Sequence, residues 1–486
     1  MTTTPMTPIT GFAPDADVTT PGLVTDCTNL IPYLNGMEGA PSAVTPASTP
    51  ALAAACQGAA VVTKLDDTRR IIAGTQTKLY ELSGGVWSDQ SRASAYTGGT
   101  DSRWSICQFG DATLAANRAD VIQRSSGTTF SDIVGAPKAE IIFSVGAFVM
   151  ALNVNDGQEK PDGWACCAAF DDTSWTPSIA TQATSGRLVS TAGRLTAGAR
   201  LGEYAVAYKQ RSIYLGRYVG APAVWDWLQV PGGEAGCIGK EALCDIGSAH
   251  FFVGDDNIWL FDGTRPVSVA DGSVREWFFA KSDPSYRYKT ICTYDRQTSR
   301  VWIFYCSSGS SSIDSALVYH VLTKKWGRAA LSIQAALNFT SASATIDGLT
   351  GYSATMDGLP SASFDSQFWL SGGRALSIVS SSNQLQTLTG ASASSGFTTG
   401  SIGDDQAVSV MTRARVRCAT QPTSAAGESL AGMEAGSTFS STSAGSITGG
   451  RFDCLQAARW HRVAFNFTGP VRVTHYDIDV TPAGLR

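Results

Sequence analysis

A strand-and-turn pattern that recurs along the chain restricts the possible folds more than any other feature of the sequence. Its clearest copy spans residues 245–279, where three short apolar runs, His250–Val253, Ile258–Phe261 and Val267–Ala270, are separated by a Gly-Asp-Asp-Asn break and an Asp-Gly turn. Glycine, asparagine and aspartate suit tight hairpin turns, and the aromatic and β-branched residues between them suit strands. This stretch is therefore predicted to be one antiparallel unit of short strands.

Weaker copies of this unit are found elsewhere between residues 57 and 330. They recur at about 45 to 50 residues, which is the period of a propeller blade. A lone sheet would expose both faces, whereas radial packing buries the faces against neighbouring blades. The sequence therefore predicts an all-β fold, a β-propeller of about six blades with aromatic residues filling the wedges between them. The recurring aromatics that close the units are Phe130, Trp175, Trp225, Trp277 and Trp326.

Composition marks out further parts of the chain around this predicted propeller core, residues 57–330. Residues 1–56 contain no Lys or Arg and several prolines, which indicates an extended N-terminal arm lying across a neighbouring surface. Residues 331–400 form a Ser/Thr-rich segment that connects to the propeller or closes it. Two Asp-Gly-Leu repeats, at Asp347 and Asp357, lie within it.

Residues 401–486 alternate apolar and polar side chains, which predicts a small antiparallel β module with one wet face and one buried face. Residues 421–450 are rich in Ser and Gly and are expected to form a loop. Arg413, Arg415 and Arg417 alternate with apolar residues and so share one face of a strand. That face is either solvated or a subunit interface that pairs with carboxylates of an adjacent copy.

Charge and hydropathy argue against two classes of partner. The formal net charge is −5 and there is no polybasic run, so sequence-specific binding of nucleic acid is not expected. The strongest apolar stretch, Ala139–Val154, is interrupted by polar residues and is shorter than the roughly 20 residues that a membrane span needs. The first basic residue is Lys64, so no secretory signal is expected, and the eleven cysteines are expected to be reduced thiols.

Acidic pairs are the strongest enzyme-like feature, because glycoside hydrolysis uses two carboxylates that face a cleft. Asp255 and Asp256 are adjacent on one predicted turn, so their side chains should diverge into solvent. Asp171 and Asp172 precede Trp175 in half of a sialidase-type Asp box, but the full repeated pattern is missing. We therefore expect no enzymatic activity and assign no catalytic residue.

Metal and cofactor motifs are also weak. His250 and His320 lie in predicted strands beside aromatic residues, which favours a core or blade-edge role over metal ligation. His461 and His475 lie on alternating strands of the C-terminal module and could face solvent. Residues 153–157 loosely resemble a calcium loop, but the closing bidentate glutamate is missing. No metal site and no cofactor are expected.

Nine segments, taken in chain order, carry a family resemblance. They are TPGLVTDCTNLIPYLNGMEGAPS, QGAAVVTKLDDTRRIIAGTQTKLYELSGGVWSD, WSICQFGDATLAANRADVIQRSSGTTFSDIVGAPKA, RSIYLGRYVGAPAVWDW, DIGSAHFFVGDDNIWLFDGTRPVSVADGSVREWFF, LVYHVLTKKWGRA, TIDGL, ATMDGLPSASFDSQFWLSGG and RWHRVAFNFTGPVRVTHYDIDVTPAGLR. In this order they resemble bacteriophage tail proteins of the nozzle or packaged-DNA-stabilisation type, found in short-tailed phages. Together they cover most of the chain.

The resemblance implies a virion structural protein without enzymatic activity. It implies a ring of six identical subunits, a tail hub around the DNA exit channel, that retains packaged DNA until ejection. Its partners would be the portal adaptor, or head-to-tail connector, and tail fibres or spikes, with DNA passing through the lumen without sequence-specific binding. The protein would reside in the phage tail of the virion, and in the host cytoplasm during assembly. The Ser/Thr-rich stretch at 332–446 departs from the family pattern.

Two alternatives stay open at the level of sequence. One is a receptor-binding tail protein, which would lie at fibre tips and not in a collar below the portal. The other is a carbohydrate-active β-propeller enzyme, which would need convergent carboxylates in a cleft.

Overall fold

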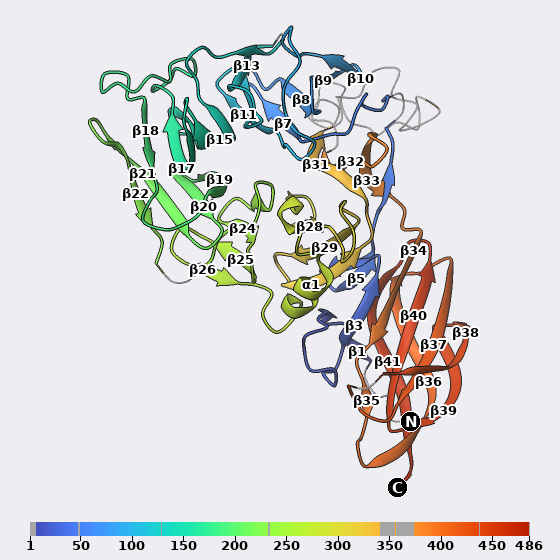
Figure 1. Cartoon of the computed structure of the whole chain (residues 1–486). Coiled ribbons are helices and arrows are strands. Elements are labelled where there is room, and N and C mark those ends of the chain that lie inside the picture. Colours follow the sequence, from blue (N-terminus) through green and yellow to red (C-terminus); the bar gives the residue numbers. More distant parts are fainter. Residues whose placement is uncertain are drawn as a thin grey trace.

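The computed structural model describes residues 6–46, 49–127, 129–231, 234–340, 355, 374–436 and 438–485. Nearly all regular structure in this part of the chain is β-strand, together with one short helix, α1 (Arg275–Lys281), and one 3-10 turn at Arg287–Lys289. Figure 1 shows two parts, a ring of sheets and an elongated stack of long strands beside it. The first part is the propeller and the second is a β-sandwich.

Six four-stranded antiparallel units follow one another between residues 59 and 329. The first three are β7 (Ala59–Thr63), β8 (Arg69–Gly74), β9 (Leu79–Ser83) and β10 (Val86–Asp89); β11 (Ser105–Phe109), β12 (Ala112–Ala116), β13 (Gln123–Ser125) and β14 (Ser131–Asp132); and β15 (Lys138–Val145), β16 (Phe148–Asn155), β17 (Glu159–Cys166) and β18 (Thr184–Arg187). The next three are β19 (Leu195–Leu201), β20 (Tyr204–Lys209), β21 (Ile213–Gly220) and β22 (Val224–Gln229); β23 (Leu243–Asp245), β24 (His250–Val253), β25 (Ile258–Phe261) and β26 (Pro266–Ser268); and β27 (Ile291–Asp295), β28 (Arg300–Tyr305), β29 (Ser315–His320) and β30 (Lys325–Ala329).

Short turns between the first two strands of a unit follow from glycine at the first turn position. Gly110 joins β11 to β12 with φ of 55°, and Gly146 joins β15 to β16 with φ of 54°. A side chain disfavours this left-handed conformation, and glycine adopts it freely. In these units the first hairpin is therefore fixed by its own turn.

A further unit closes the ring. It consists of β31 (Ile333–Thr340), β32 (Arg374–Ser380), β33 (Leu385–Gly390) and, as its outer strand, β6 (Ser42–Val44) from the N-terminal region. The first strands of successive units are neighbours around the ring, and β31 contacts both β27 and β7. The all-β propeller is therefore confirmed: the six units indicated by the sequence are present, and residues 331–400 add a seventh four-stranded unit with β6. Asp347 and Asp357 lie outside the described residues.

Four of the five aromatic residues that close the predicted units are buried in the propeller, and the fifth differs. Phe130, Trp175, Trp225 and Trp326 are buried in the propeller. Trp277, in contrast, lies on α1 and is only partly buried, and its ring meets Phe12 edge to face at a centroid distance of 5.0 Å. This aromatic therefore joins the propeller to the N-terminal region.

The sandwich consists of two sheets that draw strands from both ends of the chain. One sheet has the order β2-β3-β34-β40-β37-β38, with β35 beside β40. Its strands are β2 (Gly11–Phe12), β3 (Leu23–Thr28), β34 (Ser394–Thr399), β35 (Ile402–Gly403), β37 (Ser424–Gly432), β38 (Ser440–Ser446) and β40 (Trp460–Thr468).

The other sheet is continuous with the propeller. Its order runs β27-β28-β29-β30-β4-β5-β41-β36-β39, so the sixth propeller unit is extended by strands of the N- and C-terminal regions. The added strands are β4 (Leu30–Tyr33), β5 (Gly36–Gly39), β36 (Ala407–Thr420), β39 (Arg451–Ala458) and β41 (Arg472–Leu485), with β1 (Thr7–Pro8) paired to β41. In Figure 1 the blue N-terminal strands lie beside the red C-terminal ones.

The expected loop at 421–450 is wrong for most of its length, because β37 and β38 form an antiparallel hairpin there. Ser- and Gly-rich composition indicates exposure, and β38 is indeed an exposed outer strand. β37, however, pairs along its whole length with β40, whose Val463 and Phe465 are fully buried. Pairing with a long apolar partner therefore overrides the local composition.

The junction between propeller and sandwich is closely packed. Arg328 of β30 pairs with Leu30 of β4, and a Cβ on Gly327 would come within 2.5 Å of the Leu30 carbonyl oxygen. One hydrophobic cluster also runs through both parts, including Phe251 of the propeller and Phe465 of the sandwich. The two parts thus share a sheet and a core.

Candidate functional site

A cavity of about 870 Å³ lies on the propeller axis, at the mouth where the chain enters the first strands of the units. Its walls come from the links between units, including residues 99–103, 238–241 and 288–289. Such convergence of loops on one face is where ring-shaped folds place their interaction residues. We take this mouth as the candidate functional site.

Eight charged side chains contribute to its lining, with more cations than anions. The cations are Arg103, Arg118, Arg194, Lys240 and Lys289, and the anions are Asp101, Glu140 and Glu241.

An ion pair spans the site between two links that are far apart in sequence. Arg103 Nε lies 2.6 Å from Glu241 Oε2, and both side chains are about one quarter exposed. Lys240 Nζ donates to the Arg103 carbonyl oxygen at 2.5 Å, and the Cys292 amide donates to the Glu241 carbonyl oxygen at 2.7 Å. Lys240 and Glu241 also line a smaller cavity among the first strands, so this link lies between the two cavities.

Three of the cations have carboxylate partners, and two do not among the described residues. Besides Arg103, Lys289 Nζ lies 3.0 Å from an Asp101 carboxylate oxygen, and Arg118 pairs with Glu159 outside the cavity. The exposed Arg194 has no ion pair or side-chain hydrogen bond within the described chain, and Lys240 donates only to a carbonyl.

Burial shifts the pKa values of two groups in the wall, Lys240 and Cys56. Burial lowers the pKa of Lys240 to about 8, and the nearby Glu140 and Glu241 only partly offset this effect. At neutral pH most of this ammonium is therefore still charged, in surroundings that hydrate it poorly. Burial also raises the pKa of the Cys56 thiol to about 11, so this cysteine is not an activated nucleophile.

Two polar atoms in the wall have no hydrogen-bond partner in the described structure. Arg103 Nη2 is a buried donor, and Asn153 Oδ1 is a buried acceptor on a residue that is 2% exposed. The amide nitrogen of Asn153 is satisfied by Glu140 and by the Leu195 carbonyl oxygen. Because buried polar atoms are rarely left unpaired, their position beside a cavity favours a ligand or ordered water there.

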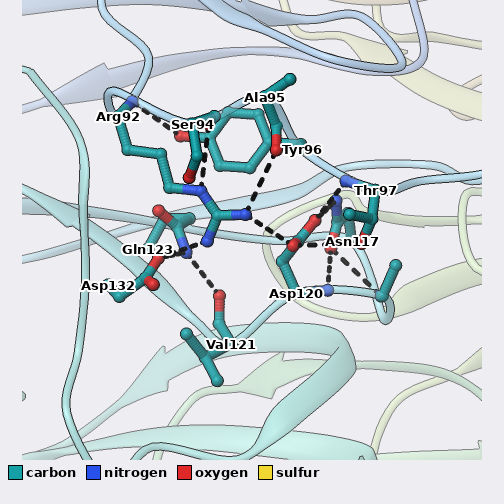
Figure 2. A network of polar contacts seen from close by, with 11 residues as sticks. Arg92, Ser94, Ala95, Tyr96, Thr97, Asn117, Asp120, Val121, Gln123 and Asp132 are labelled. Carbon is teal, nitrogen blue, oxygen red and sulfur yellow. Dashed lines mark hydrogen bonds and ion pairs between the residues drawn. The ribbon is translucent and has the colours of Figure 1, made fainter.

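A dense polar network surrounds Arg92 and Asp120 and includes Asn117, which lines the cavity (Figure 2). Arg92 lies 2.7 Å from Asp120 and 2.5 Å from Asp132, and the Thr97 amide donates to Asp120 at 2.9 Å. Burial raises the pKa of Asp120, but hydrogen bonds from Asn117 and Thr97 and the Arg92 charge lower it further than that. These contacts fix the link that leads into residues 99–103, so we assign them a positioning role.

The opposite mouth holds a second cavity of about 710 Å³ at the ends of the first strands. Its charged lining comprises Arg69, Arg200, Asp245, Asp295 and Arg296.

The acidic pairs considered above do not meet at either mouth. Asp255 lies on a turn and is 3.4 Å from Arg211, and Asp171 caps its own turn by accepting from Thr173. Asp172 is buried and forms an ion pair with Arg124 at 2.6 Å. These carboxylates serve turns and packing.

The histidines occupy interior positions, with one exception. His250 and His320 are buried in the propeller, and His250 lies between the Tyr208 hydroxyl and the Arg200 carbonyl oxygen. The sequence left open that His461 faces solvent, but its strand turns that side chain into the sandwich, where it is fully buried. There it contacts Ser409 and Gln456 at 3.0 Å each. His475 is partly exposed.

The calcium-like stretch is an ordinary turn. The Asn155 side chain accepts from the Gly157 amide at 3.0 Å, and Asp156 pairs with Lys160 at 2.6 Å. Within the described ranges, no group of three or more His, Cys, Asp and Glu side chains is placed to hold a metal ion.

The three arginines on β36 have mixed environments. Arg413 pairs with Asp453 at 2.5 Å and Arg415 with Asp479 at 2.9 Å, both within the chain. Arg417 is exposed, and its guanidinium has no partner among the residues the structure describes. Their role at a subunit interface stays a prediction.

Sequence reasoning did not single out the charged residues of the cavity, although one signal was present. Arg103, Arg194, Glu241 and Lys289 each stand one or two residues before the first strand of a unit. Superimposing the repeats would have shown that these charges fall at equivalent positions and therefore face one axis.

Comparisons with known proteins add little. No family model matches the chain, and no curated protein matches it. Among solved structures, "YCF48 bound to D1 peptide" is 13% identical, with a TM-score of 0.34, and the match covers 62% of this chain and 86% of that one. The computationally designed Ika8 protein is 10% identical, with a TM-score of 0.34 and coverage of 71% and 98%. No helix in the described part is long and apolar enough to span a membrane. At this level of similarity no family is identified, and the propeller assignment rests on the sheet topology.

Proposed function

We propose that this chain is a structural subunit of a bacteriophage tail, a nozzle or hub ring through which DNA leaves the particle. The observation that carries the proposal is the sheet shared by propeller and sandwich, which joins them through main-chain hydrogen bonds. A subunit whose parts are joined in this way resists bending, as a wall of a pressurised conduit must. The motif order that resembles tail nozzle proteins supplies the specific role.

The propeller axis itself does not serve as the conduit in this proposal. Lys240 and Glu241 lie on that axis and separate the cavities along it. DNA would instead pass through a lumen between several copies, six according to the resemblance. A net charge of −5 would let such a lumen repel phosphate and leave DNA free to slide.

The decisive experiment is imaging of purified particles with this chain labelled. A sixfold ring below the portal supports the proposal, whereas a trimer at fibre tips would favour the receptor-binding alternative. A strongly basic lumen in the ring would contradict the sliding argument.

The arginine face offers a second test at the level of the subunit. Arg417→Glu should prevent ring formation if β36 lies at the interface, because it places a like charge opposite a carboxylate. Arg296→Glu, in the cavity at the other end of the propeller, is the matched charge reversal and should leave the ring intact. If analytical ultracentrifugation shows the same loss of ring formation for both variants, the arginines of β36 do not lie at the subunit interface.

A further inference from the structure

We infer that the charged mouth of the propeller is a binding site for an acidic protein segment, one that presents Asp, Glu or a terminal carboxylate to Arg194 and Lys240. The inference goes beyond the proposed assembly and does not depend on it.

The charge balance of the cavity points to an anion. Glu241 and Asp101 are occupied by Arg103 and Lys289, and Glu140 accepts a hydrogen bond from the Asn153 amide. The cations left without a carboxylate are Arg194 on the rim and Lys240 in the wall. A carboxylate between them would gain charge-assisted hydrogen bonds that water supplies poorly at a desolvated ammonium.

The unsatisfied atoms in the wall are independent evidence that something polar belongs there. Arg103 Nη2 offers a donor and Asn153 Oδ1 an acceptor, and neither has a partner among the described residues. A peptide carries both kinds of group along its main chain, so small shifts of these side chains would allow one segment to satisfy both.

The apolar part of the lining favours a peptide over an acidic glycan. Ile238, Ile313 and Ile333 line the same cavity, and Tyr288 is its one aromatic residue within the described chain. Isoleucine side chains suit the mixed apolar and acidic side chains of a protein segment, whereas a sugar chain presents hydroxyl groups on every ring. A volume of about 870 Å³ is ample for a short segment.

The test is fluorescence anisotropy of the full-length protein with labelled hexaglutamate, against hexaglutamine and hexagalacturonate of equal length. We expect saturable binding of hexaglutamate alone. Arg194→Gln and Lys240→Met should each weaken it by about tenfold, the effect of one charge-assisted contact. Arg200→Gln, a matched change at the opposite mouth, should leave the affinity unchanged.

Three outcomes would overturn the inference: no saturable binding of hexaglutamate, equal or tighter binding of hexagalacturonate, or an equal loss with Arg200→Gln. Because Arg194 is exposed, its variant should melt at the wild-type temperature, which keeps a loss of binding separate from misfolding. Ring formation is not measured in this assay, so the site and the assembly can fail independently.

Discussion

At the scale of single residues, Glu38 connects three distant segments. On β5 it accepts from Arg300 of the propeller at 2.6 Å and from Arg472 of the C-terminal strand β41 at 2.8 Å. Arg300 is buried and also donates to the Pro32 carbonyl oxygen at 2.8 Å. One carboxylate therefore neutralises a buried charge at the junction of propeller and sandwich.

Replacing Glu38 by Gln should lower the free energy of unfolding by about 3 kcal/mol, since it leaves the buried Arg300 charge uncompensated. Urea denaturation measures this loss. Arg472→Gln is the matched control, because Arg472 is almost half exposed and its removal should cost less than about 1 kcal/mol. Similar losses in the two variants would show that burial of Arg300 does not set the energy of this junction.

The affinity of the charged mouth for hexaglutamate should depend on pH through Lys240. Its pKa is lowered to about 8, and the charged groups that face it are Arg103, Glu140 and Glu241. Below about pH 8 the ammonium is present and binds; above it, the free protein must first take up a proton, so affinity falls by up to about tenfold per pH unit. Anisotropy titrations across this range test the sign, and Lys240→Met should remove the dependence.

At the scale of elements, what the sequence could predict depends on how local each contact is. The six units between residues 59 and 329 were recognisable because each hairpin carries its own turn residues. For the seventh unit the sequence indicated only that residues 331–400 connect to the propeller or close it, because its outer strand β6 comes from the N-terminal region and lies 343 residues from its partner in β33. The small, polar side chains of β38 predict a loop, although its partner strand decides its conformation.

Gly390 tests whether β6 closes the ring. A Cβ at this position would collide with Ser42 and come within 2.7 Å of Val44, so Gly390→Ala should displace β6 from β33. We expect a loss of about 1–3 kcal/mol in stability, as for other overpacked sites. Amide hydrogen exchange should accelerate in β6 and β33 and stay unchanged in β11 to β14.

Gly99→Ala is the control for that substitution, since the nearest atom to its added Cβ lies 3.7 Å away. If Gly390→Ala exchanges like Gly99→Ala and the wild type, the added Cβ does not displace β6 and the prediction is wrong.

At the scale of the whole molecule, the candidate site is a product of ring closure. Arg103, Arg194 and Lys240 come from three different links and have no fixed spacing that a motif could capture. These three residues can be placed together only when the number and order of the units are known, and the sequence indicated the number of units only approximately. The pairing of Arg103 with Glu241, 138 residues apart, could not be read from local pattern for the same reason.

Propeller and sandwich should unfold together, because they share a sheet and a hydrophobic cluster. Differential scanning calorimetry of the wild type should show one transition. Gly327→Ala would push β30 away from Leu30 and Ile31 of β4, and should split the profile into two transitions. Two transitions in the wild type would contradict the shared-core argument.

The placement of β6 has a consequence for synthesis of the protein on the ribosome. At about 5–20 residues per second, roughly 20 to 70 seconds separate the translation of β6 from that of its partner strand β33. During that interval the nascent N-terminal region lacks the strands that later pair with it, including β34 and β41. Prematurely terminated chains would keep these strand edges open, and open edges promote aggregation. The ring can therefore close only after β33 has been synthesised.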